Sequence, residues 1–274
     1  MSEMESLFGR AMGGWAEVSA RYGQLADAPR ASLTVEGYSF KVVLNPTRSV
    51  STLAKVDARS IASRPCFLCP ANQPAEQEAL RWQGYKIQVN PFPIFSTRHF
   101  TISSLRHEPQ QLAPHFADMV ALARQLPGYV VFYNGAGAGA SAPDHLHFQA
   151  GPAAELPLFV SERWIAGERH RLASGSMPGD NAALAALTGI IAEAERQSPI
   201  NVISWADEQG GVEVQLFRRR CHRPACYGAE PGQLLVSPGS IDLAGLVTVI
   251  RPADFAALTA QPALLAGIVA EVTR

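Results

Sequence analysis

The sequence lacks three features that would each assign the chain to a broad class of protein. It has no apolar run near the roughly 18 residues that a membrane-spanning helix needs. It has only 4 cysteines among 274 residues, too few for a disulfide scaffold. It also lacks net charge, because 23 lysines and arginines nearly balance 24 aspartates and glutamates. We therefore expect no general binding to nucleic acid, and any phosphate must be bound by a local site.

The first 14 residues, MSEMESLFGRAMGG, also lack the basic start and the continuous apolar core of a signal peptide. We therefore expect a cytoplasmic protein that does not bind a membrane. Hydrophobic residues make up 47% of the chain, which is enough to bury a substantial core. The length allows one large domain or two smaller ones.

Helical and strand patterns follow one another without a regular strand–helix–strand rhythm, which favours an α+β fold over a doubly wound parallel sheet. Helices are expected at residues 5–22, 110–126 and 182–196. A helical tail should begin near Pro252 and break at Pro262. Strands are expected at residues 38–44, 85–89, 99–103, 129–133, 145–150, 201–205 and 211–218.

The segment 134–149, NGAGAGASAPDHLHFQ, combines a glycine-rich loop with two histidines. Side chains alternate between the two faces of a strand, so His145, His147 and Gln149 should share one face. The loop before them contains nothing bulky, so its backbone N–H groups could approach an anion closely, with Ser141 as a further donor. This pattern indicates phosphate chemistry carried out by histidine.

Three other known motifs match the sequence in part, two of them in this segment and one at the cysteine pair, and each fails at a specific position. Gly135-x-Gly137-x-x-Ala140 mimics a dinucleotide-binding fingerprint, but that motif opens a helix and the alternation in DHLHFQ predicts a strand. Gly139, followed after five residues by His145-x-His147, matches the start of a cupin metal motif. That motif would next need a glutamate at position 151 or 152, which hold glycine and proline. A zinc deaminase carries H-x-E ahead of its cysteine pair, and none precedes Cys66.

The cysteines occur in two places. Cys66 and Cys69 form a C-x-x-C pair, which in a reducing compartment indicates a metal or redox site, with a buried reduced pair as the alternative. Cys221, His222 and Cys226 are expected to be packing residues and not a second metal site.

Positive charge for a phosphate must come from nearby arginines or lysines. In the first half these are Arg48, Lys55 and Arg64. The densest cluster is residues 218–223, RRRCHR, for which a solvated basic face and a phosphate-binding role both remain open.

These motifs resemble the transferase branch of the histidine-triad (HIT-like) superfamily. That branch includes galactose-1-phosphate uridylyltransferase, diadenosine tetraphosphate phosphorylase and plant GDP-galactose phosphorylase. The resemblance covers most of the chain from about Asn45, and the sequence also resembles a bacterial family of uncharacterised proteins in this group. It is carried by PCFLC at 65–69, VNPFPI at 89–94, HFTI at 99–102, DHLHFQA at 144–150 and SPGSIDLAG at 237–245.

The resemblance implies a HIT-like α+β fold of antiparallel sheets with flanking helices, built from two HIT-like halves. Residues 1–160 would form the catalytic half with a zinc site. Residues 161–274 would form a more divergent half that completes the substrate site.

The resemblance also implies the activity. His147 would attack the α-phosphorus of a nucleotide sugar or a dinucleoside polyphosphate and form a covalent nucleotidyl-histidine, and phosphate or a sugar phosphate would accept the nucleotide. Gln149 and Ser141 would act with it, and because Gln cannot shuttle a proton as histidine can, transfer is favoured over attack by water. The expected nucleotide- and phosphate-binding residues are Asn90, Asn134, Gly135, Gly137, Gly139, Ser141, Gln149 and Arg220.

The uridylyltransferase pattern implies a structural zinc ion bound by Cys66, Cys69, His107 and His145, two thiolates and two imidazoles in a closed tetrahedral set. Two other functions stay open: a phosphohydrolase that uses the same histidine with water, and a non-catalytic nucleotide- or metal-binding protein. A homodimer is open as well, because the resembled proteins include both monomers and dimers.

Overall fold

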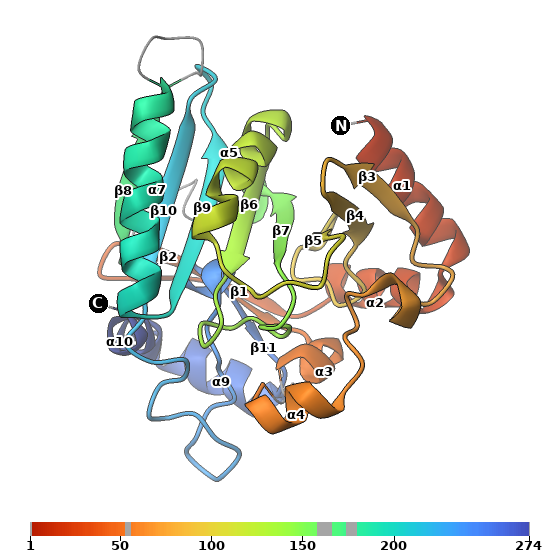
Figure 1. The fold of residues 1–274 in the computed structure, drawn as a ribbon. Coiled ribbons are helices and arrows are strands. Elements are labelled where there is room, and N and C mark those ends of the chain that lie inside the picture. Colours follow the sequence, from red (N-terminus) through yellow and green to blue (C-terminus); the bar gives the residue numbers. More distant parts are fainter. Residues whose placement is uncertain (1, 53–55, 158–165, 174–179, 274) are drawn as a thin grey trace.

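The computed structural model describes residues 2–52, 56–157, 166–173 and 180–273, and these residues form two β-sheets (Figure 1). Every strand pair of the larger sheet is antiparallel. Its strands are, in spatial order, β3 (Ala79–Trp82), β4 (Tyr85–Val89), β5 (Phe100–Ser104), β7 (His147–Pro152), β6 (Tyr129–Asn134), β9 (Ile200–Ala206), β10 (Val212–Arg218) and β8 (Glu168–Leu172). The smaller sheet contains β1 (Arg30–Val35), β2 (Tyr38–Leu44) and β11 (Leu246–Val249). The expected α+β fold with antiparallel sheets and flanking helices is confirmed.

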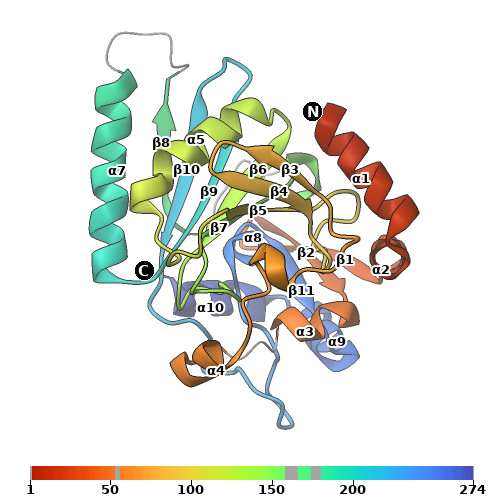
Figure 2. The same ribbon diagram turned by 45° about the vertical axis from the view of Figure 1, so that its right-hand side comes forward.

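Different layers cover the two faces of the larger sheet (Figures 1 and 2). Against one face pack α1 (Ser2–Gly14), α2 (Ala16–Ala26), α5 (Phe116–Gln125) and α7 (Asp180–Gln197). Against the other lie the smaller sheet and the helices α8 (Ser240–Leu243), α9 (Pro252–Ala260) and α10 (Ala263–Val272). The short helices α3 (Ser49–Thr52) and α4 (Ala58–Ser63) follow β2.

Strand β6 lies between these two layers, and all of its residues are buried. Tyr129, Val131 and Tyr133 belong to the core under α5 and α7, whereas Val130 and Phe132 belong to the core under the smaller sheet. A strand buried on both faces has no polar alternation, which explains the continuous apolar run YVVFY.

The two halves of the chain share both sheets. β6 of the first half pairs with β9 of the second, and β2 pairs in parallel with β11. The expected boundary at residue 160 falls within 158–165, outside the described residues, and stays a prediction.

Most expected elements are present, and the differences have local causes. The helix expected at 5–22 is two helices, because the chain breaks after Gly13 and Gly14. Residues 113–115, which include Pro114, form a 3₁₀ turn, so α5 begins only at Phe116. β7 begins at His147, so the expectation that His145 lies within this strand is wrong. Strands β1, β3, β8 and β11 were not expected. In β1, β3 and β8 most residues are exposed or half-buried, so these strands have no apolar pattern that would reveal them.

The helical tail divides at Pro262 into α9 and α10, as expected. Among the described helices none is by itself long and apolar enough to cross a membrane, and α9 with α10 reaches that length only across a bend of 103°.

Candidate active site

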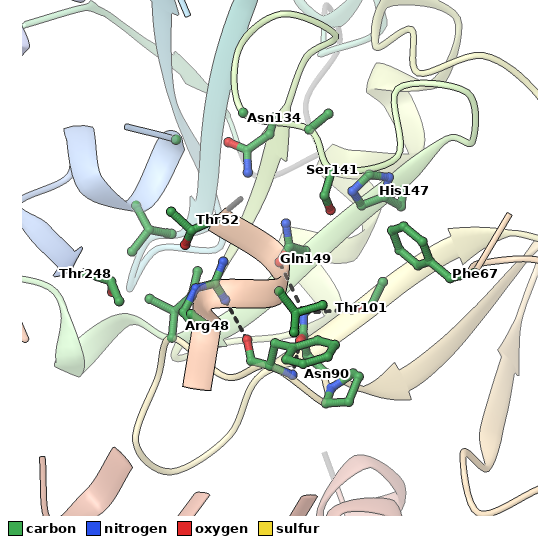
Figure 3. A pocket seen from close by; sticks show the side chains of 18 of the residues that line it. Arg48, Thr52, Phe67, Asn90, Thr101, Asn134, Ser141, His147, Gln149 and Thr248 are labelled. Carbon is green, nitrogen blue, oxygen red and sulfur yellow. Dashed lines mark hydrogen bonds between the residues drawn. The ribbon is translucent and has the colours of Figure 1, made fainter. Parts of the chain in front are cut away.

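A cavity of about 510 Å³ opens beside β7, and both halves of the chain line it (Figure 3). Of the sequence-predicted site residues it brings together Asn90, Asn134, Gly139, Ser141, His147 and Gln149. Gly135, Gly137 and Arg220 are not among its lining residues. The volume lies within the range of roughly 300–1,000 Å³ that is typical of small-molecule sites.

His147 has one ring nitrogen committed to the protein. Its Nδ1 lies 2.8 Å from the carbonyl oxygen of His145, and a carbonyl can only accept, so Nδ1 carries the proton and donates it. Burial lowers the pKa of the His147 imidazole to about 4, which keeps the ring neutral at pH 7. The unprotonated Nε2 is therefore a lone-pair donor on the side chain that lines the cavity.

A chain of hydrogen bonds orients the amide of Gln149. The backbone N–H of Ile94 donates to Nδ1 of His99 at 3.2 Å, so the proton of His99 must be on Nε2. That Nε2 donates to Oε1 of Gln149 at 3.0 Å, and the amide of Asn90 donates to the same oxygen at 3.3 Å. Burial, with the charge of Arg48, holds the pKa of His99 well below its usual value.

This chain turns the NH₂ group of Gln149 away from Asn90 and toward the side where Ser141 and His147 lie (Figure 3). Asn90 itself is engaged within the protein, because its amide also donates to Thr101 Oγ1 at 3.0 Å and its oxygen accepts from the N–H of Phe92 at 2.8 Å. Its geometry is that of a brace for Gln149.

Asn134 is held in a similar way. Its Oδ1 accepts from Nδ2 of Asn201 at 2.8 Å, and from the N–H and the hydroxyl of Ser240 at 2.8 and 2.7 Å. These donors leave the NH₂ group of Asn134 as the free end of the side chain, which lines the cavity. Amide donors suit the anionic oxygens of a phosphoryl group.

The glycine loop is more self-contained than its composition suggested. The N–H of Gly135 donates to Ile200, and those of Ala138 and Ala140 donate back to the carbonyl of Gly135. A Cβ at position 135 would lie 2.7 Å from the Ile200 oxygen, so this glycine is needed for close packing against β9. Gly137 and Gly139 adopt positive φ angles of 72° and 97°.

The arginines of residues 218–223 have different environments. Arg218 pairs with Glu168, Arg219 is fully buried, and Arg220 is exposed away from the cavity. Arg223 and its neighbour His222 line the cavity instead. Residues 218–223 therefore do not form a uniform basic face, and Arg220, which was expected to bind phosphate, does not line the cavity.

Of the two described basic residues expected in the first half, Arg48 lines the cavity and Arg64 does not. Its guanidinium donates to the carbonyl of Phe92, and burial lowers its pKa to about 10 against the opposing effect of the Asp242 carboxylate. Arg64 pairs with Asp144 at 3.1 Å, and Lys55 lies outside the described residues.

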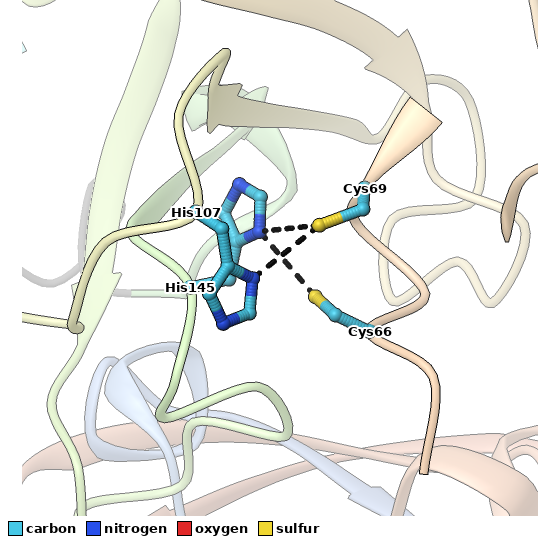
Figure 4. Close-up of side chains that lie close together, drawn as sticks. All are labelled: Cys66, Cys69, His107 and His145. Atoms are coloured by element: carbon cyan, nitrogen blue, oxygen red, sulfur yellow. Dashed lines mark hydrogen bonds between the residues drawn. The ribbon is translucent and has the colours of Figure 1, made fainter. Parts of the chain in front are cut away.

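The four residues expected to bind a metal come together (Figure 4), and Phe67 and Leu68, between the two cysteines, line the cavity. The ligand atoms of Cys66, Cys69, His107 and His145 all lie within 4.8 Å of one another. Nδ1 of His145 is 3.3 Å from Sγ of Cys66 and 3.6 Å from Sγ of Cys69, and Nδ1 of His107 is 3.3 Å from Sγ of Cys69. This cluster could hold a metal ion.

The spacing and tautomers of the cluster fit a tetrahedral ion. A zinc ion at its usual bond lengths separates a thiolate sulfur from an imidazole nitrogen by about 3.6 Å. Nε2 of His145 donates to the carbonyl of Ser104 at 2.9 Å, which leaves Nδ1 deprotonated and directed at the sulfurs. Nε2 of His107 lies 3.7 Å from the Asp144 carboxylate, a partner that metal-binding histidines commonly have.

The second group of cysteines does not converge in this way. Cys221 contacts the backbone of α10, and Cys226 packs against the core of the smaller sheet. Within the described ranges, only Cys66, Cys69, His107 and His145 form a group of His, Cys, Asp or Glu side chains able to hold a metal.

Several residues that position the site were not predicted from the sequence. Gln110 accepts from the N–H of His147 at 2.8 Å and donates to the carbonyls of Asn134 and His147 at 2.8 and 3.0 Å. It therefore fastens the start of β7 to the end of β6. Arg219 and Ser240 lie in segments that the sequence singled out, but nothing in those segments predicts their positioning role, and Asn201 lies in no motif.

Comparison with solved structures assigns the fold. Yeast Ap4A phosphorylase Apa2 matches with a TM-score of 0.62 at 16% identity, over 94% of this chain and 96% of that chain. Its complex with AMP gives 0.57 at 15% identity (94% of each chain), and its complex with Ap4A gives 0.58 at 14% (94% and 96%). The chain therefore has the α+β, HIT-like fold of these phosphorylase structures.

A family model identifies the chain more specifically than the fold does. Residues 7–152, more than half of the chain, match the model of the family described as "Domain of unknown function (DUF4922)", and the chain belongs to that family. No significant match is found among curated proteins. The matched region contains His147, Gln149 and the four residues of the metal cluster.

Proposed function

We propose that the protein is a nucleotidyl-transferring phosphorylase that acts on dinucleoside polyphosphates or nucleotide sugars through a covalent intermediate on His147. The observation that carries this proposal is the tautomer of His147. Because Nδ1 donates to the His145 carbonyl, Nε2 is the free nucleophile on the cavity wall. Two of the solved structures of similar fold are complexes of Apa2 with AMP and with Ap4A, which agrees with a nucleotide ligand for this chain.

In the first step Nε2 attacks the α-phosphorus, a P–N bond forms, and the P–O bond to the departing phosphate or sugar phosphate breaks. The leaving group departs as an anion, so it needs no proton. The ring becomes cationic, and the His145 carbonyl that accepts from Nδ1 stabilises this charge. In the second step an oxygen of inorganic phosphate or of a sugar phosphate attacks the same phosphorus, and the P–N bond breaks.

The amide groups would stabilise the phosphoryl oxygens during both steps. Gln149 and Asn134 have their oxygens occupied by protein donors, so their NH₂ groups are fixed as donors toward the cavity. The hydroxyl of Ser141 would donate from the same wall. The Cys66, Cys69, His107 and His145 cluster would bind zinc, which would brace the start of β7 without taking part in the reaction.

The test is labelling of the full-length protein with substrates that carry ³²P at the α-phosphate, followed by denaturation in acid and in alkali. A phosphoramidate on histidine is lost in acid and stable in alkali. Wild-type protein should be labelled, and His147→Ala should not. Absence of label with both dinucleoside polyphosphates and nucleotide sugars would refute the proposal. Products formed with and without phosphate distinguish a phosphorylase from a hydrolase.

A further inference from the structure

Three polar side chains from the second half form a group on the wall of the cavity. His222 and Arg223 follow β10, and Ser237 precedes α8. The hydroxyl of Ser237 lies 3.2 Å from Nε2 of His222 and accepts from Nε of Arg223 at 3.4 Å. We call these three residues the second-half cluster.

The cluster lies against the glycine loop. A Cβ placed on Gly139 would be 3.3 Å from the Cα of Gly239, two residues beyond Ser237. Gly139 and Ser141 line the same cavity as the cluster and His147. The cluster and the expected nucleophile therefore face one shared space.

Arg219 holds the two segments of the cluster together from behind. Its buried guanidinium donates to the carbonyl of His222 at 2.9 Å and to that of Pro238 at 2.8 Å. The guanidinium of Arg223 lies over the ring of Tyr227, 4.1 Å from its centroid, which restricts its position. The cluster is thus held in place by the protein before any ligand arrives.

Arg223 differs from the other arginines that line the cavity in its charge balance. Arg21 pairs with Glu17, and the charge of Arg48 is offset by Asp242. For Arg223, no carboxylate within the described ranges lies at ion-pair distance, and its two terminal nitrogens donate to no described residue. A half-buried guanidinium without a counter-charge favours an anion in the adjoining space.

The chemistry of the cluster indicates which anion it would take. A planar guanidinium offers two parallel N–H groups that match two oxygens of a phosphate. Burial, together with the charges of Arg223 and Arg219, lowers the pKa of His222 to about 4, so the imidazole and the Ser237 hydroxyl are neutral hydrogen-bonding groups. A tetrahedral oxyanion suits one cation flanked by neutral donors.

We propose that Arg223, His222 and Ser237 form the binding site for the phosphate group of the second substrate, the one that receives the nucleotide from His147. This assignment rests on the proposed function for the identity of the reaction, but the phosphate site can be tested without it. The shared chemistry is a phosphate dianion, supplied either as inorganic phosphate or as a sugar phosphate.

The test is binding of inorganic phosphate to the full-length protein by isothermal titration calorimetry, with wild type, Arg223→Gln and Arg220→Gln. Arg220 is the matched control, because it lies three residues away and is exposed outside the cavity. Loss of a charge-assisted hydrogen bond should raise the Kd for phosphate about 10- to 100-fold in Arg223→Gln. Arg220→Gln should stay within about twofold of wild type, because a distant exposed charge is screened.

Two further measurements keep the outcome decisive. Arg223→Lys and Ser237→Ala, with thermal melts for every variant, separate loss of phosphate binding from loss of folding. Hexose 1-phosphate as a second probe distinguishes the two sources of the phosphate group, since the source that binds more tightly is the substrate class. Equal weakening in Arg223→Gln and Arg220→Gln, unchanged affinity in Arg223→Gln, or no phosphate binding by wild type would each overturn the site.

The two proposals fail independently. Wild-type protein that binds phosphate through Arg223 but takes no α-phosphate label would retain the site and lose the covalent mechanism. Labelled protein whose phosphate affinity ignores Arg223 would retain the mechanism and lose the site.

Discussion

The two halves of the molecule use the same structural unit differently. β6 and β7 in the first half, and β9 and β10 in the second, are neighbouring antiparallel pairs of one sheet. Between β6 and β7 the chain makes a long glycine-rich loop and returns with His145 and His147. Between β9 and β10 it makes a short turn, closed by the Asp207 carboxylate, which accepts from the N–H groups of Gln209 and Gly211.

The two halves would therefore meet two different requirements of the proposed transfer reaction. In the first half the protein fixes neutral groups, an imidazole and two amides, by satisfying every other polar atom of those side chains. The second half contributes Arg223, for which no described carboxylate lies at ion-pair distance. The buried Arg219 supports the segment that carries Arg223. A neutral imidazole from the first half and an arginine without a described counter-charge from the second would together suit the anionic substrate proposed above.

The largest effect is expected when His147 is replaced with alanine. The same replacement at His222, the cavity histidine of the second half, is its comparison. His147→Ala should lower the rate of α-phosphate labelling about 10⁴-fold or more, because it removes the proposed nucleophile. His222→Ala, the counterpart in the second half, should leave labelling within about tenfold, because this residue would contact only the phosphate group. Rapid-quench labelling measures both. Equal losses in the two variants would erase the distinction between the halves.

The next effect should come from the amide donor on β7. Gln149→Glu keeps the shape and the acceptor for His99 but replaces an N–H donor with a negative charge, so labelling should fall about 10²- to 10³-fold. Gln209→Glu, in the exposed turn of the second half, is the matched control and should change nothing. A Gln149→Glu enzyme of normal rate would show that this amide does not contact the phosphoryl group.

The two groups of cysteines offer a third contrast. Cys66→Ser should lose the bound metal and lower labelling about 10- to 100-fold, because His145 then loses the ion that would brace the start of β7. Cys226→Ser should retain the metal and the rate, since this thiol only packs against the core. Metal content by inductively coupled plasma mass spectrometry, measured beside the labelling rate, checks both. Identical metal content in the two variants would exclude Cys66 as a ligand.

Local patterns in the sequence predicted a large part of this picture. Alternation predicted β4 and β2, a continuous apolar run predicted β6, and two prolines predicted where helices begin or divide. The α+β class followed from the irregular order of helical and strand patterns, and the set Cys66, Cys69, His107 and His145 followed from the resemblance to the uridylyltransferase pattern. These features depend on residues close together in the chain or on a motif matched as a whole.

The missed features depend on the fold. β7 begins at His147 and not at His145, because His145 turns toward the two cysteines, a contact across more than 70 residues. The glycine loop was expected to offer its amides to a ligand, but three of them bond within the protein. Arg219 and Arg220 are adjacent, chemically identical and lie just after β10, yet Arg219 is fully buried and Arg220 is exposed, a difference that arises only in the folded chain.

Arg219 gives the last and smallest expected effect on the reaction. Its guanidinium donates to Oδ1 of Asn201 at 2.7 Å and, through Nε, to the carbonyl of Val272 at 3.1 Å, besides the two carbonyls beside the second-half cluster. Arg219→Met should leave these acceptors buried and unpaired and lower the free energy of unfolding by about 3 kcal/mol. Labelling should fall only a few-fold, because Asn134 is still held by Ser240.

The control for that measurement is the preceding arginine. Arg218→Met removes an ion pair with the half-exposed Glu168, and such a pair contributes at most about 1 kcal/mol. Urea unfolding of both variants gives the comparison. If the two free energies fall equally, the buried arginine is not what fastens the second-half segments, and the positions of His222 and Ser237 must then depend on other contacts. If only Arg219→Met is destabilised and its phosphate Kd also rises while Arg223 is intact, the second half holds its phosphate site in place through this one buried side chain.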